Sequence, residues 1–185
     1  MLTPEDLSYL LRDLATSLLD ASARDASEAA TMDGVALLKN RVQTKGEDAD
    51  GNPFTAYSTK DVPLFFYKNK SRSGSDTAVK RLEANAAPSK TASYSDWRVA
   101  NNLRVDIKDF TFTGRMMTNI RIINSQFSPG YIFREVGPAG DEEKKKMENL
   151  TKQQGEIMAW NKDETDHVGE AFKNELIERL KEALQ

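Results

Sequence analysis

Two aspartates and an asparagine at every second position are the first candidates for chemistry in this sequence. Asp48, Asp50 and Asn52 have the spacing of the first half of a calcium-binding loop. The rest of that pattern is missing, because Pro53 occupies the position of the turn glycine and Thr59 that of the bidentate glutamate. Residues of these types in close succession favour a tight turn, so we expect a plain turn and no bound metal.

The histidine and a glycine–arginine pair are the other candidates for chemistry. His167 follows Asp166, but no nucleophile elbow accompanies them, and we expect a polar residue near a helix start. Arg115 follows Gly114 and could bind an anion, although a structural arginine at a strand end is the simpler interpretation. One histidine and no cysteine exclude a multi-histidine or thiolate metal site within a single chain. We expect no catalytic residue, metal or cofactor, and no enzyme. An enzyme with an unrecognised site stays open as an alternative, and it would require a deep pocket with convergent polar groups.

A short basic patch also leaves two interpretations open. Lys68, Lys70 and Arg72 lie among serine, asparagine and glycine, which is typical of a solvated loop tip. The alternative is a stand-alone binding module that uses this loop to contact nucleic acid or an acidic protein partner. Stacking aromatic residues are not interleaved with the patch, and the net charge of −3 argues against a general nucleic-acid coat.

Composition indicates a single domain of 185 residues with a modest core. Charged residues make up 30% and hydrophobic residues 38%, so part of the chain is expected to be extended or covered by neighbours. The N-terminus lacks the basic and apolar regions of a signal peptide. No apolar run reaches the roughly 20 residues that span a bilayer, so we expect no membrane partner.

Helical patterns frame the chain at both ends. The N-terminal pattern contains a stripe of leucines at helical spacing, Leu7, Leu10, Leu11, Leu14 and Leu18. A second pattern ends at Gly46, a predicted C-cap. Gly34 costs about 1 kcal/mol in a helix interior, so one long helix and two helices both remain open. Near the C-terminus, acidic residues 141–143 begin a helix, residues 162–167 interrupt the pattern, and a final amphipathic helix starts at Val168.

The middle of the chain combines a long excursion with a β-rich segment. Residues 62–67, VPLFFY, are either a strand or an anchor that docks on a neighbour. We interpret residues 67–93 as a long excursion with one helical turn near its centre. After a short helix that opens at Tyr94, residues 103–112 alternate as in a half-buried strand. One helical turn at residues 115–117 precedes two strands, 119–124 and 131–136, which a tight connection pairs antiparallel.

These elements predict an α+β fold of one domain, residues 1–185. A small antiparallel β-sheet is flanked by an N-terminal helical segment and C-terminal helices, with a long loop excursion. The expected divisions are N-terminal helices in 1–46, the excursion in 47–93, the sheet core in 94–137 and the C-terminal helices in 138–185.

Several phrases of the sequence resemble a bacteriophage family. They are LKNRVQTKG at residues 38–46, DADGNPF at 48–54, Tyr57-Ser58, YSDWR at 94–98 and FTFTGRMM at 110–117. Together they are similar to the small virion morphogenesis proteins, also called tail-completion or head–tail joining proteins. The resemblance covers residues 31–136, and the C-terminal helix fits it more loosely.

The resemblance implies a structural virion subunit of a tailed phage, assembled in the host cytoplasm. Such proteins form oligomeric rings in the neck as head–tail connectors, between portal or adaptor and tail proteins. Nucleic acid would pass such a ring at most transiently, through its lumen. Thin apolar stripes and long polar stretches agree with a surface that other copies cover. The expected partner-interface residues are Leu7, Leu11, Leu64, Phe65, Phe66, Lys68, Lys70, Arg72 and Arg115.

Overall fold

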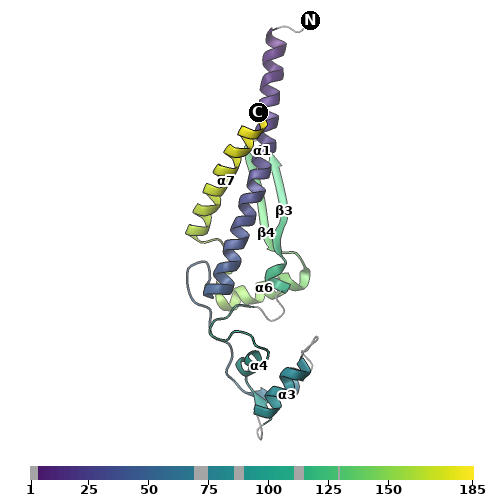
Figure 1. Cartoon of the computed structure of the whole chain (residues 1–185), viewed down its shortest axis with the longest axis vertical. Helices are drawn as coiled ribbons and strands as arrows, with labels where there is room; N and C mark the ends of the chain where they lie inside the picture. Colours follow the sequence, from purple (N-terminus) through teal and green to yellow (C-terminus); the bar gives the residue numbers. More distant parts are fainter. Residues whose placement is uncertain (1–3, 69–74, 86–89, 111–114, 129) are drawn as a thin grey trace.

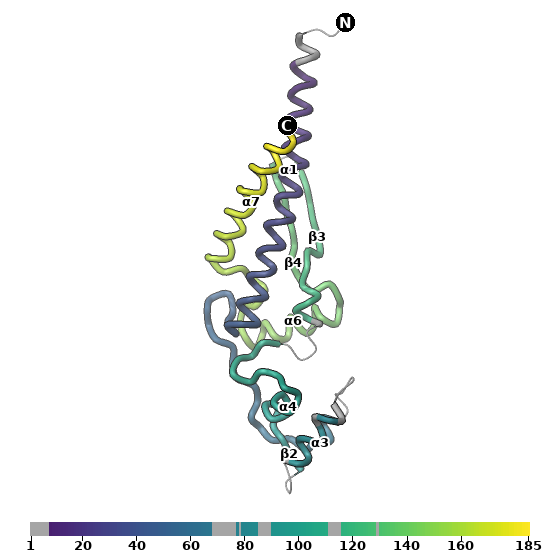
Figure 2. The backbone as a smooth tube through the Cα atoms, viewed as in Figure 1, coloured from purple at the N-terminus to yellow at the C-terminus, as the bar shows by residue number. Residues whose placement is uncertain are grey.

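The computed structural model describes residues 4–68, 75–85, 90–110, 115–128 and 130–185 (Figures 1 and 2). The fold is α+β, as predicted, with two separate two-stranded antiparallel sheets among the described residues. The first part of the chain contains α1 (Pro4–Asn40), η1 (Arg41–Lys45), β1 (Val62–Pro63), α2 (Phe65–Lys68), α3 (Ser75–Asn85), β2 (Thr91–Ala92) and α4 (Tyr94–Ala100). The second part contains α5 (Arg115–Thr118), β3 (Ile120–Ser128), β4 (Tyr131–Pro138), α6 (Asp141–Gln154) and α7 (Lys162–Ala183).

The N-terminal pattern forms one continuous helix. α1 has 37 residues, a length of about 55 Å at 1.5 Å per residue. It runs directly into the π-helical segment η1 and ends at Gly46, which adopts a left-handed conformation with φ 73°. The backbone N–H of Gly46 donates to the carbonyl of Arg41 at 3.0 Å. The predicted glycine C-cap is therefore confirmed, and the two-helix alternative is not adopted.

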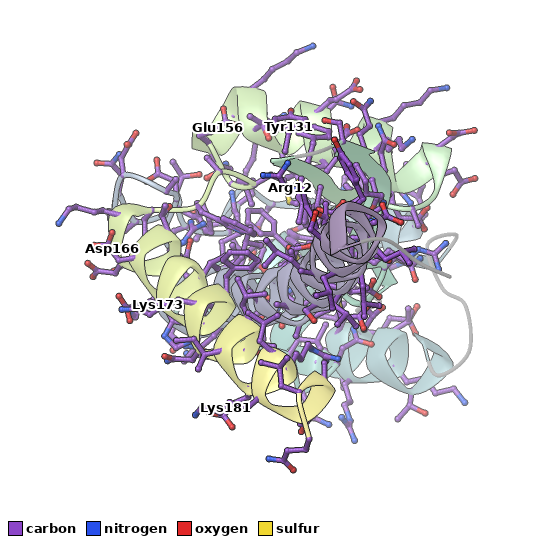
Figure 3. All side chains as sticks on the ribbon, turned by 90° about the horizontal axis from the view of Figure 1, so that it is seen from above. Arg12, Tyr131, Glu156, Asp166, Lys173 and Lys181 are labelled. Atoms are coloured by element: carbon purple, nitrogen blue, oxygen red, sulfur yellow. The ribbon has the colours of Figure 1, made fainter. Side chains whose placement is uncertain are left out.

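Gly34 marks a close approach between helices rather than a break in α1. A Cβ atom at this position would lie 2.7 Å from Val168 Cγ2 and 2.8 Å from Trp160 Cζ2. Both distances are shorter than normal van der Waals contact, so only glycine lets α7 and the segment before it lie this close to α1. α7 runs along one side of α1, as Figures 1 and 3 show.

The central strands form a long hairpin beside α1. β3 and β4 pair antiparallel from Ile120↔Pro138 to Ser128↔Tyr131, with a register shift between Ile122 and Asn124. The predicted antiparallel pair is confirmed, and both strands extend beyond their expected ends. A two-stranded hairpin is marginal on its own in water, so its contacts with α1 stabilise it.

The predicted strand at residues 103–112 is wrong for the described part, which ends at Phe110. Residues 101–110 form turns and irregular chain. Asn102 and Phe110 have φ values of 56° and 55°, a left-handed conformation incompatible with an extended strand. The side chain of Asp109 is buried, where it accepts hydrogen bonds from Tyr57 and Arg98. Phe112, the last residue of that expected strand, lies outside the described residues.

The apolar side chains form two separate cores. The first core joins the end of α1 to the hairpin, α5, α6 and the segment before α7, with Leu38, Met117, Ile120 and Ile157 at its centre. We call this part the large lobe. The second core contains Leu64, Tyr67, Leu82, Ala92, Trp97 and Ala100. It lies in the small lobe, which consists of β1, α2, α3, β2 and α4 (Figure 1).

Residues 47–93 are more regular than the expected excursion. α3 has 11 residues, where one helical turn was predicted. Val79 and Leu82, three residues apart on α3, are both buried, which gives this polar helix one face to pack. In the run at 62–67, Val62 and Pro63 form the strand β1, which pairs with β2, and a helical turn begins at Phe65. Docking of this run on a neighbour stays a prediction.

The final helix begins six residues earlier than predicted. Residues 162–167 do not interrupt the helical pattern, because they form the first turns of α7. Asn161 caps this helix: its Oδ1 accepts from the N–H of Glu164 at 2.8 Å, and Glu164 Oε2 accepts from the N–H of Asn161 at 3.0 Å. This reciprocal capping box stabilises a helix start without apolar residues. The break lies instead between α6 and α7.

The packing at Gly34 generates a prediction. Gly34→Ala should lower the free energy of unfolding by roughly 1 kcal/mol, because overpacking against Trp160 and Val168 outweighs the gain in helix propensity. Gly169→Ala in α7 is the matched control, since its Cβ would meet no atom within 4 Å. That control should be neutral or stabilising. Urea unfolding of both variants measures the difference, and equal stabilisation of the two would contradict this packing.

Candidate interaction surface

The N-terminal half of α1 projects beyond the rest of the molecule (Figure 1). The side chains of residues 8–17 are all exposed, and we call this segment the projecting helix. Leu10, Leu11 and Leu14 are 53%, 57% and 57% exposed. The predicted leucine stripe is therefore helical, but its described part faces solvent up to Leu18, the first residue that is half-buried.

This exposure identifies the projecting helix as a candidate interaction surface. Helical stability in proteins comes mostly from packing of an apolar face, and residues 8–17 have no such packing within their own chain. Contiguous exposed apolar side chains on a water-facing surface mark sites of association. Among the predicted interface residues, Leu11 lies on this surface, whereas the side chain of Leu7 lies outside the described residues.

A groove lies below the projecting helix, between α1, the hairpin and α7. It has a volume of about 920 Å³, near the upper end of the range of ligand pockets. Its apolar lining comes from all three elements and from the segment before α7: Leu19, Phe127, Tyr131, Phe133, Trp160 and Phe172. Phe127, Tyr131 and Phe133 are also partly exposed, so the groove opens to solvent along the hairpin.

Two arginines line the groove. The guanidinium groups of Arg24 and Arg134 lie over the ring of Phe127, at 5.0 and 5.2 Å from its centroid. Arg134 is held in place by Ser27 Oγ at 2.8 Å and by the Arg24 carbonyl at 2.7 Å. It also pairs with Glu28 at 3.4 Å. Arg24 is exposed, and its charge is available at the rim of the groove.

Sequence reasoning missed these groove residues. Aromatic side chains on both sides of the hairpin turn, at Phe127 and Tyr131, were the available signal. A hairpin tip that faces only water is usually polar, so two aromatic residues there indicate a contact surface. The arginines gave no comparable signal, because only the fold brings Arg24 and Arg134 to one ring.

A second exposed apolar pair lies in the small lobe, at the opposite end of the molecule. Phe65 and Phe66 are 59% and 49% exposed, and their rings stack with centroids 4.4 Å apart. Leu64 lies beneath them in the second core, where it supports α2 rather than facing solvent. Among the predicted interface residues whose side chains are described, Leu11 is therefore exposed on the projecting helix, Phe65 and Phe66 are exposed in the small lobe, and Leu64 is buried. These two exposed surfaces lie at opposite ends of the molecule (Figure 1).

The remaining predicted interface side chains lie outside the described part of the chain. They are those of Lys68, Lys70, Arg72 and Arg115. The backbone of residues 115–118 forms the expected helical turn, α5. Met116 and Met117 are buried in the first core.

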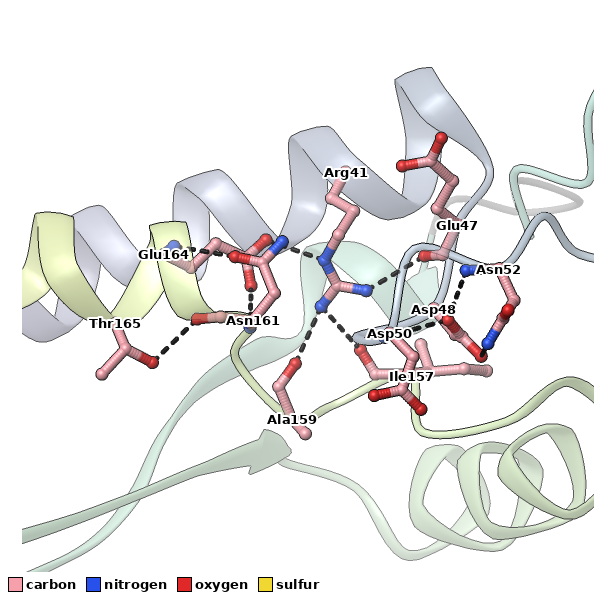
Figure 4. Close-up of polar contacts among 10 residues, drawn as sticks. All are labelled: Arg41, Glu47, Asp48, Asp50, Asn52, Ile157, Ala159, Asn161, Glu164 and Thr165. Carbon is pink, nitrogen blue, oxygen red and sulfur yellow. Dashed lines mark hydrogen bonds and ion pairs between the residues drawn. The ribbon is translucent and has the colours of Figure 1, made fainter.

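Arg41 fixes the geometry of the large lobe (Figure 4). Its Nε donates to Glu164 at 2.8 Å, and the two side chains are only 3% and 6% exposed. Its other nitrogens donate to the carbonyls of Glu47 at 3.0 Å, Ile157 at 3.3 Å and Ala159 at 2.8 Å. One guanidinium therefore connects the end of α1, the following turn, the segment before α7, and α7 itself.

Asp48 organises the predicted turn. Its carboxylate accepts from the N–H groups of Asp50 and Asn52 at 3.0 and 2.8 Å, and from Asn52 Nδ2 at 3.1 Å. Burial raises the pKa of Asp48, but these hydrogen bonds and nearby Arg41 outweigh it and hold the pKa below 3.8. The carboxylate is thus occupied by the turn. Among the described residues, no cluster of three or more potential acidic or histidine ligands could hold a metal.

A second buried ion pair connects the two lobes. Arg98 Nη2 donates to Asp109 Oδ1 at 2.8 Å, and its Nε donates to the Arg104 carbonyl at 2.6 Å. The Tyr57 hydroxyl donates to the same carboxylate at 2.9 Å, and the guanidinium lies 4.0 Å from the centroid of the Tyr57 ring. Burial, and then the bond to Asp109, raise the pKa of Tyr57. The hydroxyl therefore stays protonated and donates.

His167 is an exposed residue of the first turns of α7, as predicted. In the described part of the chain, no helix combines the length and apolar character needed to cross a bilayer. Comparison of the chain with protein-family models, curated proteins and solved structures found no match.

The buried pair at Arg41 generates a second prediction. Arg41→Met leaves Glu164 buried without its partner, which should cost about 3–5 kcal/mol of unfolding free energy. Arg104→Met is the control, because Arg104 and Asp106 form an ion pair at 2.7 Å with side chains 48% and 65% exposed. Solvent screens that pair, so its loss should leave the urea midpoint nearly unchanged. Similar midpoints for both variants would contradict the role of Arg41.

Asp48 gives a prediction about pH. Its lowered pKa stabilises the fold above its unfolded pKa, and this contribution is lost as pH falls through the folded pKa. Asp48→Asn should therefore destabilise the protein at about pH 7 and differ less from the parent at about pH 3. Urea midpoints at both pH values test this, with Asp50→Asn, an exposed neighbour, as the control. A constant difference between Asp48→Asn and the parent would contradict it.

Proposed function

We propose that this protein is a structural virion subunit of a tailed bacteriophage. In this proposal it forms an oligomeric ring in the neck and joins the portal or adaptor to the tail, without catalysis or a cofactor. The observation that carries the proposal is the projecting helix, whose apolar side chains face solvent over residues 8–17. An element of this kind fits a subunit that is completed by other copies.

The separation of the two exposed surfaces supports a joining role. The projecting helix lies at one end of an elongated molecule, and Phe65 and Phe66 lie in the lobe at the other end (Figure 1). A subunit that bridges two different neighbours needs contact surfaces that face apart. In the proposal, one surface contacts copies of the chain, and the small lobe contacts a neighbouring virion protein.

The phrases that resemble phage morphogenesis proteins support the proposal through the fold. Arg41 and Gly46 fix the end of η1, and Asp48 organises the turn that follows. Tyr57 and Arg98 both contact Asp109. The residues of these phrases thus hold loops and helix ends in place, as expected when a motif preserves an architecture rather than an active site.

The proposal predicts oligomers in solution and copies in particles. The full-length chain should elute as a symmetric oligomer in size-exclusion chromatography with light scattering, and negative-stain microscopy should show closed rings. Mass spectrometry of purified phage particles should detect the chain at a fixed ratio to the portal protein.

The converse results would count against the proposal. A chain that remains monomeric, and that is missing from particles whose other neck proteins are present, has no structural place in the neck. Binding to nucleic acid that weakens steeply with salt, by a monomer, would instead favour the module that uses Lys68, Lys70 and Arg72.

A further inference from the structure

We propose that the projecting helix of one copy docks in the groove of a second copy of this chain. The inference rests on the proposed oligomer and adds the contact that builds it. Both surfaces are apolar and open to solvent, and α1 contributes to both. An exposed apolar helix and an apolar groove that is open to solvent are therefore present on the same chain.

The spacing of the leucines suits this mode of binding. Leu7, Leu10, Leu11 and Leu14 occupy positions i, i+3, i+4 and i+7 of α1, the anchor pattern of a helix that lies in a groove. A helix with side chains is about 10–12 Å across, and the groove of about 920 Å³ is large enough for the apolar face of a few turns. Its aromatic lining offers flat surfaces to leucine side chains.

The occupant must come from another molecule. α1 is one uninterrupted helix from Pro4 to Asn40, and its middle part, residues 19–31, forms one wall of the groove. The projecting helix could return to its own groove only if α1 broke and reversed direction. No such break is present, so the helix points away from the groove of its own chain (Figure 1).

Charge favours a second copy as that molecule. On the projecting helix, Asp13 is exposed and lies three residues from Leu10. At the groove, Arg24 is exposed and lies over the ring of Phe127, whereas Arg134 is already paired with Glu28. An exposed carboxylate beside the leucines and an exposed guanidinium at the groove are complementary, and such complementarity favours one partner and one orientation.

The geometry also sets the type of assembly. The helix and the groove are different patches, so the contact is head-to-tail, and each copy offers one patch to each neighbour. A head-to-tail contact gives a closed ring when the rotation between copies closes, and a filament when it does not.

Cysteine crosslinking tests the contact directly, because the chain has no cysteine of its own. One batch carries Ser8→Cys on the projecting helix. The other carries Ser128→Cys, beside the hairpin turn, or Thr165→Cys, in the first turn of α7; both residues line the groove. The two batches are dissociated, mixed, reassembled and treated with a short bismaleimide. The expected result is a crosslinked mixed dimer with at least one groove position, and the preferred position reports the direction of the helix.

Val99→Cys is the matched control, because Val99 is exposed in α4 of the small lobe and should not crosslink to Ser8→Cys. Oligomers that crosslink at neither groove position overturn this inference and leave the proposed oligomer standing. Crosslinks only between two Ser8→Cys helices overturn it in favour of helix pairing. Monomers that never crosslink overturn both the inference and the proposed function.

Alanine variants test the energetics without added cysteines. Leu10→Ala with Leu14→Ala should weaken self-association on the order of a hundredfold, because both residues are anchors in the contact. Arg12→Ala with Thr16→Ala has the same spacing on the opposite face of the helix and should weaken it far less. All four side chains are exposed, so circular dichroism should show unchanged folding. Equal effects of the two pairs, measured by sedimentation equilibrium, would overturn the docking mode.

Discussion

A single buried guanidinium, that of Arg41, determines how the large lobe is arranged. An arginine in the interior is tolerated only when its charge is paired and its N–H groups have acceptors. Arg41 has both, through Glu164 and the carbonyls of Glu47, Ile157 and Ala159. These acceptors lie in the turn that follows η1, in the segment before α7 and in α7, so all three are held to the end of the N-terminal helix. Because Glu164 belongs to the first turn of α7, this contact also sets where α7 starts along α1, and with it one wall of the groove.

A second buried arginine performs the same task where the lobes meet. Arg98 and Tyr57 contact the carboxylate of Asp109, and the neighbouring Phe110 packs on Phe54, with ring centroids 4.9 Å apart. The physical reason for these polar anchors lies in the composition. With 38% hydrophobic residues divided between two small cores, apolar burial alone leaves the connecting segments weakly specified. Fully satisfied polar networks give such segments one defined conformation.

Local signals in the sequence predicted the elements that local interactions determine. Alternation and turn residues predicted the hairpin, and Gly46 predicted the end of η1. One error occurs where a distant partner decides the outcome. Residues 103–110 alternate like a strand, but burial of the Asp109 carboxylate against Arg98 and Tyr57 imposes an irregular path. The error at the start of α7 has a different cause, because that start depends on a local capping box of Asn161 and Glu164 rather than on apolar periodicity. The leucine stripe predicted an amphipathic helix. It did not show that this face is exposed, because the periodicity is the same for a face that packs on its own core and for one that binds a partner. The groove depends on three elements, so only their packing reveals it.

The rigid connection between α1 and the groove has a consequence for any ring. A ring closes only if every contact between copies has the same rotation, so the angle between the two patches on each copy must be fixed. The projecting helix is one end of α1, and the other end is held by Arg41 and by the close packing at Gly34. The groove is built on the middle part of α1, residues 19–31, between the projecting helix and this anchored end. In the proposed assembly, the contacts that stabilise the monomer therefore also set the direction of the helix relative to the groove. The projecting helix adds nothing to the core, and its length and orientation are features of the interface that the core supports.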